Sequence, residues 1–235
     1  MVLKLKQKYV IASEKIWNEN IHTSLNKNVD CEFILLSNRR DLNIDNLRII
    51  NPKIIFFPHW SYLIPEEIYT EFECIVFHMT DLPYGRGGSP LQNLIMNGFS
   101  DTKITAIRVV KELDAGPVYI KKDLNLSGSA NEIFNRLAVL IEKMIEIIIL
   151  KPCQPRPQIG EPIFFKRRTP DQSNLKFATS SKVIFDMVRM LDADGYPHAY
   201  VEIDNFRIEF TNAEDKNGNI SSKASFIKIN KKVET

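Results

Sequence analysis

The residues with the clearest capacity for acid–base chemistry are His78 and two aspartates that follow it. His78 ends an apolar run, residues 74–77, and comes just before a loop rich in glycine. Asp81 follows closely, and Asp114 lies on a tight turn, LDAG. A histidine that acts as a general acid or base needs a carboxylate to orient it and to stabilise its cation. The pattern leaves open which aspartate does so, because aspartate is also a favoured turn residue.

Several basic residues could bind an anionic ligand. Arg86 lies between two glycines, where the main chain can approach a ligand closely. The run Lys166, Arg167 and Arg168 could bind phosphate, although a short basic run is also typical of a solvated surface.

His59 and Trp60 end another apolar run. If both runs are parallel strands, these two residues lie at the same sheet edge as His78 and could wall a pocket. The spacing of His59, His78 and Asp114 does not resemble a metal-ligand set, so we expect no metal.

The elements that must position these residues alternate between apolar runs and polar or helical segments. Residues 8–13, 31–37, 53–60 and 74–77 are predicted as strands. This alternation predicts an α/β fold with a Rossmann-like parallel sheet and crossover helices. The first strand-to-helix turn lacks glycine, which argues against dinucleotide binding.

Two helices have signals at their starts. Ser89 and Gln92 have the spacing of a capping box, and Gly98 suits the end of the same helix. Ser129 and Glu132 form a second predicted capping box before a long helix that ends at residue 150.

The 235 residues fit one α/β domain with a small appendage. We expect a catalytic domain over residues 1–152, a proline-rich linker over 153–175, and a small β-rich subdomain over 176–235.

Composition limits the function classes. A net charge of +2 with 26% charged residues argues against extensive binding to nucleic acid. Three scattered cysteines and the lack of an apolar leader favour the cytoplasm. The helix over residues 133–150 carries charges, so we expect no membrane span, and its apolar end, EIIIL, suggests a possible homodimer.

The segment HMTDLPYGRGGSPLQN, followed by LDAG, resembles the signature of folate-dependent formyltransferases. This family includes glycinamide ribonucleotide formyltransferase, methionyl-tRNA formyltransferase and the nucleotide-sugar N-formyltransferases. Its motif runs N-x-H-x-S-x-L-P, then R-G-x-x-P, then D-x-G, and the resemblance covers roughly residues 8–170. The matching positions are His78, Leu82, Pro83, Arg86, Gly87, Pro90, Asp114 and Gly116.

The resemblance implies transfer of a formyl group from 10-formyltetrahydrofolate to an amine, without a metal. His78 would relay the proton and stabilise the oxyanion, and Asp114 would hold His78. The implied folate-binding residues are Leu82, Arg86, Gly87, Leu113, Gly116 and Trp60. The implied acceptor-binding residues are His59, Asp81, Tyr84, Lys166, Arg167 and Arg168.

One motif position differs. The family's asparagine, two residues before the histidine, is Val76 here. Losing such an oxyanion donor costs about 2.7–4 kcal/mol in a comparable site. Thr80 and Asn93 are candidate replacements, and the change raises the alternative of a 10-formyltetrahydrofolate hydrolase.

The acceptor follows by comparison within the family. The short C-terminal part and low net charge argue against tRNA. The expected acceptor is a nucleotide-linked amino sugar, such as a 4-amino-4,6-dideoxy sugar of pseudaminic acid synthesis, with no nucleic-acid or membrane partner. The motif also resembles the formylation domain of linear gramicidin synthetase. A peptidyl or aminoacyl formyltransferase, and a catalytically idle folate or sugar-nucleotide binder, remain alternatives.

Overall fold

The computed structural model describes residues 6–229. Residues 1–5 and 230–235, which include the ends of the predicted catalytic domain and β-rich subdomain, lie outside this range. The chain forms two compact units that alternate along the sequence. Unit 1 comprises Met1–Gly87, Thr102–Leu124 and Asn135–Phe164, and unit 2 comprises Gly88–Asp101, Asn125–Phe134 and Phe165–Thr235.

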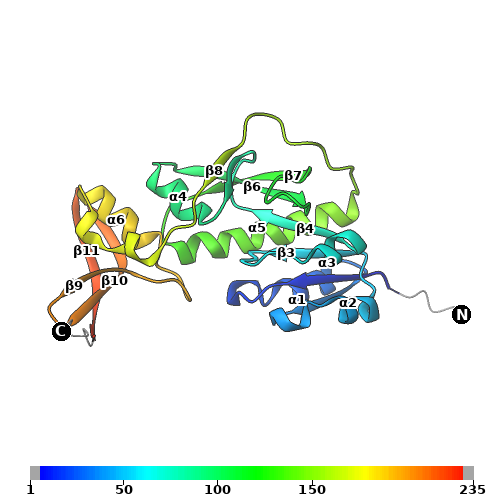
Figure 1. The fold of residues 1–235 in the computed structure, drawn as a ribbon, viewed down its shortest axis with the longest axis horizontal. Helices are drawn as coiled ribbons and strands as arrows, with labels where there is room; N and C mark the ends of the chain where they lie inside the picture. The colour runs from blue at the N-terminus through cyan, green and yellow to red at the C-terminus, as the bar shows by residue number, and fades with distance from the viewer. Residues whose placement is uncertain (1–5, 230–235) are drawn as a thin grey trace, which may run out of the picture. The chain divides into compact units, whose positions relative to one another are not determined.

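The six-stranded sheet has the order β2-β1-β3-β4-β6-β7 (Figure 1). β1 pairs in parallel with β2 and β3, and β3 with β4, whereas β6 is antiparallel to β4. This arrangement confirms the predicted Rossmann-like α/β fold. The strands are β1 (Lys8–Ala12), β2 (Glu32–Leu36), β3 (Ile54–Pro58), β4 (Glu73–His78), β6 (Asp101–Arg108) and β7 (Val118–Asn125).

Helices cover both faces of the parallel strands in unit 1. On one face, Leu47 of α2 (Ile44–Ile50) and Ile68 of α3 (Glu66–Glu71) belong to a buried cluster with Phe57. On the other face, aromatic rings of neighbouring strands pack in a row, with Tyr9 stacked on Phe33 and Phe56. Successive side chains of a strand point to opposite faces, so runs buried on both faces are apolar throughout.

The remaining helices of the chain include one long helix. α1 (Ile21–Asn28) contacts α5 (Ala130–Leu150), where the hydroxyl of Ser24 donates to Glu142 at 2.5 Å. The apolar end of α5 is mostly used within the chain, since Ile148 is buried and only Leu150 is largely exposed. The predicted homodimer therefore stays a prediction. Short 3-10 turns are η1 (Ile16–Asn18), η2 (Arg39–Asp41), η3 (Pro170–Ser173) and η4 (Leu175–Phe177).

The glycine-rich loop after His78 contains a strand that the sequence does not predict. β5 (Tyr84–Gly87) pairs with β8 (Ile163–Phe165), which lies within the predicted linker. The main-chain N–H of Ile163 donates to the carbonyl of Pro83 at 3.2 Å. Two glycines give β5 a low strand propensity, and its partner is distant in sequence, so local patterns miss the pairing.

The predicted capping box of α4 (Pro90–Met96) is not formed. Ser89 has a φ of 51° and its hydroxyl accepts a hydrogen bond from the main-chain N–H of Arg168. The Gln92 amide donates instead to the carbonyl of Met190. Tertiary contacts have therefore replaced the local cap.

The second predicted capping box, before α5, is present. The N–H of Ser129 donates to the Glu132 carboxylate at 2.8 Å, and the N–H of Glu132 donates to the Ser129 hydroxyl at 3.3 Å. Gly98, at the end of α4, has the left-handed φ of 82° expected of it.

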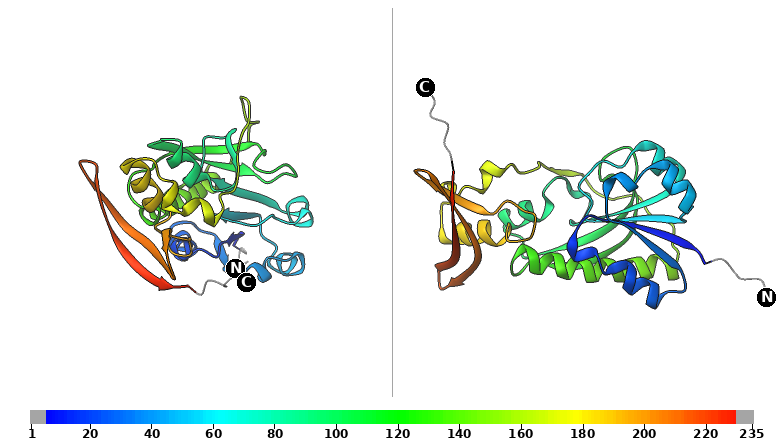
Figure 2. Two further views of the ribbon diagram at one scale, coloured as in Figure 1. Left: turned by 60° about the vertical axis from the view of Figure 1, so that its left-hand side comes forward. Right: turned by 90° about the horizontal axis from the view of Figure 1, so that it is seen from below.

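Unit 2 contains the β-rich part of the chain. α6 (Ser181–Arg189) packs on an antiparallel sheet of β9 (Ala199–Ile203), β10 (Phe206–Lys216) and β11 (Asn219–Lys228). Figure 2 shows β10 and β11 as one long hairpin. The predicted boundaries after residues 152 and 175 stay a prediction. Among residues 6–229, no helix combines the length and apolar character that crossing a bilayer requires.

Candidate active site

His78 is the last residue of β4 and is almost fully buried. Its Nε2 lies 2.7 Å from the carbonyl oxygen of Gly85, so Nε2 must carry a proton and donate it. Its Nδ1 lies 3.6 Å from Oδ1 of Asp114. Both ring nitrogens therefore face oxygen acceptors, which fix the orientation of the imidazole at the end of β4.

Asp114 is the aspartate that faces His78. Its other oxygen, Oδ2, accepts a hydrogen bond from the N–H of Gly87 at 2.9 Å. Asp114 has a φ of 53°, a left-handed conformation that aspartate tolerates better than most residues. The D-x-G turn thus brings this carboxylate back to the strand end and to the glycine loop.

Asp81 has a different environment. Its carboxylate pairs with Lys121 at 2.5 Å and with Lys103 at 3.3 Å, and Lys121 also donates to the carbonyl of Leu82. Burial disfavours the charged carboxylate, but the two lysines hold the pKa of Asp81 below its ordinary value. Asp81 therefore anchors the loop after β4 to β6 and β7, and Asp114 is the aspartate that lies beside the His78 ring.

Val76, at the position of the family's asparagine, packs against the apolar cluster that includes Phe57, as Trp60 does. Thr80 is fully buried, and its hydroxyl lies 3.4 Å from the Gly85 carbonyl that His78 also uses. Thr80 thus shares an acceptor with His78.

Asn93 lies in unit 2, and its amide nitrogen donates to the carbonyls of Gly88 and Lys166, both at 3.0 Å. Both amide protons are engaged in these bonds. An oxyanion-donor role for Asn93 would require at least one of them to break.

His59 and Trp60 follow β3 at the same edge of the sheet as His78. His59 has a φ of 55°, and burial lowers its pKa to about 3, so it is neutral at physiological pH. The Trp60 indole packs edge-on against Phe57 and Tyr62, and its N–H is buried without a hydrogen-bond partner among the described residues.

The remaining predicted folate-binding residues differ in exposure. Leu82 is buried in the core, whereas Leu113, next to Asp114, is 58% exposed. Gly116 must be glycine, because an added Cβ would lie 1.7 Å from the carbonyl oxygen of Arg108. Tyr84 is half-buried in β5. The Arg86 guanidinium donates to the side chain of Gln158, a residue that the sequence analysis places only in a linker.

The basic run belongs to unit 2. Lys166 and Arg167 are exposed. Arg168 is half-buried, donates to the carbonyl of Gln172, and has a pKa lowered by burial. Among the described residues, no group of three histidines, cysteines or acidic residues could hold a metal ion.

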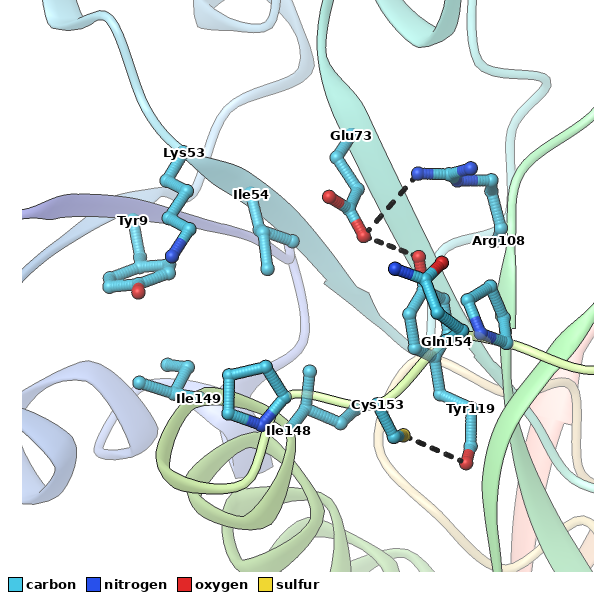
Figure 3. A pocket seen from close by; sticks show the side chains of 12 residues that line it. Tyr9, Lys53, Ile54, Glu73, Arg108, Tyr119, Ile148, Ile149, Cys153 and Gln154 are labelled. Atoms are coloured by element: carbon cyan, nitrogen blue, oxygen red, sulfur yellow. Dashed lines mark hydrogen bonds and ion pairs between the residues drawn. The ribbon is translucent and has the colours of Figure 1, made fainter.

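A pocket of about 160 Å³ lies at the opposite end of the strands (Figure 3). Tyr9, Ile54 and Glu73 come from the first residues of β1, β3 and β4, whereas His78 ends β4. Glu73 accepts a hydrogen bond from the Tyr119 hydroxyl and pairs with Arg108 at 3.6 Å. This pocket is separate from the His78 site.

One solved structure resembles nearly the whole chain. It is a methionyl-tRNA formyltransferase from Clostridium thermocellum, 42% identical, with a TM-score of 0.91. The match covers 94% of this chain and 99% of that one. The chain belongs to the formyltransferase family. A family model for the methionyl-tRNA formyltransferase C-terminal domain also matches residues 170–227.

More distant formyltransferases extend the comparison. A curated methionyl-tRNA formyltransferase from Thermodesulfovibrio yellowstonii is 27% identical over 75% of this chain. The chain spans 59% of that relative's length and 57% of the next one. A 4-N formyltransferase from Francisella tularensis shares the fold, with a TM-score of 0.60 at 16% identity over 96% of this chain and 98% of that one.

These findings overturn the expected amino-sugar acceptor. The relatives with the higher identities are methionyl-tRNA formyltransferases, whereas the sugar enzyme matches only at the level of fold. The curated methionyl-tRNA formyltransferases are indeed longer than this chain, but length does not exclude that class, because the chain covers 99% of the solved Clostridium thermocellum structure. Net charge was a weak guide, because nucleic-acid binding depends on local patches. Without the amino-sugar acceptor, the expectations of a pseudaminic acid pathway and of no nucleic-acid partner also lose their support.

Proposed function

We propose that this protein transfers a formyl group from 10-formyltetrahydrofolate to the amino group of an aminoacyl acceptor, methionyl-tRNA. The observation that carries the chemistry is the pairing of the buried His78 with the partly buried Asp114, with Nδ1 and Oδ1 3.6 Å apart. The acceptor is supported by the 42% identity to a methionyl-tRNA formyltransferase.

In this proposal His78 takes the proton that the attacking amine must lose. The amine attacks as a neutral base, and the addition creates an oxyanion that needs a nearby positive charge. Once protonated, His78 supplies that charge, and Asp114 stabilises the imidazolium. The carbonyl of Gly85 fixes the ring through Nε2.

The folate donor is supported by membership of the formyltransferase family. Leu113, next to Asp114, is exposed and offers apolar surface beside the site. Three free cysteines, Cys31, Cys74 and Cys153, agree with a reaction in the reducing cytoplasm.

A second candidate is hydrolysis of 10-formyltetrahydrofolate, which the apolar surroundings of Val76 favour. The test is release of tetrahydrofolate from 10-formyltetrahydrofolate with three additions: methionyl-tRNA, uncharged tRNA, or buffer alone. We expect release only with methionyl-tRNA. Equal release in buffer would support the hydrolase, and equal release with uncharged tRNA and with methionyl-tRNA would contradict the proposed acceptor.

A further inference from the structure

We propose that Gln158 is a positioning residue that holds Asp114 in place beside His78; its effect on turnover rests on the function proposed above. The Gln158 amide nitrogen donates to the carbonyl oxygens of Asp114 at 2.8 Å and Gly116 at 2.9 Å. Its amide oxygen accepts from Nε and Nη2 of Arg86, at 3.2 and 2.8 Å. One side chain from the segment after α5 therefore joins the glycine loop to the D-x-G turn.

The orientation of this amide follows from its partners. A guanidinium can only donate hydrogen bonds and a main-chain carbonyl can only accept them. The amide oxygen must therefore face Arg86, and the NH₂ group must face the two carbonyls. All the hydrogen-bonding groups of the Gln158 side chain are used, and a flipped amide would break every one of these bonds.

These contacts form a closed circuit around the catalytic carboxylate. Gln158 holds the main chain of Asp114, Asp114 accepts from the N–H of Gly87, and Gly87 is joined covalently to Arg86, which returns to Gln158. Asp114 has a left-handed φ, a conformation that persists where surrounding contacts hold it. Without Gln158 the turn loses two of those contacts.

Asp114 is the charged group whose position relative to His78 would be controlled by Gln158. Asp114 is the ionisable side chain recorded against His78 among the described residues. From β5 the ring meets the carbonyl of Gly85, and its partner in β6 is the neutral Thr105. Asp81 is paired with lysines. A small displacement of Asp114 therefore removes the counter-charge that faces His78 among residues 6–229.

Gln158→Glu is the sharpest test, because it keeps the size and the acceptor for Arg86 but removes both donors. Gln154→Glu is the matched control: it adds the same charge in the same segment, and Gln154 is exposed with no recorded hydrogen bond. We expect Gln158→Glu to lower kcat by about 10- to 100-fold with little change in KM. We also expect faster hydrogen exchange at the Gly87 amide, whereas Gln154→Glu changes neither.

Two further measurements separate positioning from a general structural role. In an Asp114→Asn background, Gln158→Glu should cause little additional loss of kcat, because it acts through Asp114; a full additive loss would overturn the proposal. If Gln158→Glu does not fold, Arg86→Met opens the circuit from the other side and should also accelerate exchange at Gly87.

The exchange measurement does not depend on the acceptor. If the wild-type protein proves inactive with methionyl-tRNA, the proposed function fails, but faster exchange at Gly87 in Gln158→Glu still supports the positioning role. Gly87 exchange and kcat that both match the wild type in a folded Gln158→Glu protein would overturn it.

Discussion

At the residue scale, the candidate site depends on one imidazole held between a carbonyl and a carboxylate. His78 donates through Nε2 to Gly85 and turns Nδ1 toward Asp114. The sequence indicated His78 from its place at a strand end, and the family resemblance selected Asp114. Neither the sequence pattern nor the resemblance indicated Gln158, because its four hydrogen bonds join segments that are distant in sequence and leave no local pattern.

Replacing either member of the pair should remove most activity while the fold is retained. We expect His78→Asn and Asp114→Asn each to lower kcat by about 100-fold or more, because each removes general acid–base catalysis. The measurement is steady-state tetrahydrofolate release. His22→Asn, in α1, serves as the control and should match the wild type. Unchanged turnover in His78→Asn would refute the assigned role.

Val76→Asn restores the amide of the family motif. We expect the rate of formyl transfer to stay the same or rise, because an amide at this position can donate to the developing oxyanion. The free energy of unfolding should fall by about 1–3 kcal/mol, since Val76 packs in an apolar cluster. Urea unfolding and kcat together check this. A folded but inactive variant would mean that the motif is misaligned at the end of β4.

At the scale of elements, sequence patterns predicted what local physics determines. The four parallel strands, α5 and its Ser129–Glu132 capping box follow from apolar runs and capping residues. The β5–β8 pairing and the uncapped start of α4 do not, because tertiary partners decide them. The identity of the acceptor could not be predicted from the sequence patterns either, since length and net charge do not describe a binding surface.

The turn between β6 and β7 should be intolerant of a side chain at Gly116. An added Cβ would collide with the carbonyl of Arg108, so we expect Gly116→Ala to destabilise the protein by about 3 kcal/mol. At Gly98 an added Cβ would meet open space, so Gly98→Ala should lower the free energy of unfolding by only about 1 kcal/mol, because alanine tolerates the left-handed φ less well. Denaturant unfolding of both variants measures the difference, and equal losses would contradict this account.

The lysine clamp on the loop after β4 predicts a pH dependence. The pKa of Asp81 is lower in the folded protein than its ordinary value of 3.8, so the folded state binds fewer protons there. The resulting stabilisation is present at neutral pH and is lost as the pH falls below 3.8. Because Asp81 is partly exposed, Asp81→Asn should cost less than about 1 kcal/mol at pH 7.

Unfolding curves at several pH values check this prediction. The free-energy difference between the wild type and Asp81→Asn should shrink toward zero in acid. A difference that stays constant with pH would show that the loss has another origin, such as altered packing of the loop.

At the scale of the whole molecule, a Rossmann-like unit carries the His78 site and a second unit carries a β-rich segment that matches a methionyl-tRNA formyltransferase C-terminal domain. Fold and family follow from this organisation. The proposed function adds the acceptor, methionyl-tRNA, which would supply the attacking amine and would also be a nucleic-acid partner.

The most direct measurement follows a labelled formyl group from 10-formyltetrahydrofolate. The account predicts that the label appears on the amino group of methionyl-tRNA with the wild-type protein and is nearly absent with His78→Asn. Label recovered only as formate, or transfer that His78→Asn leaves intact, would contradict it.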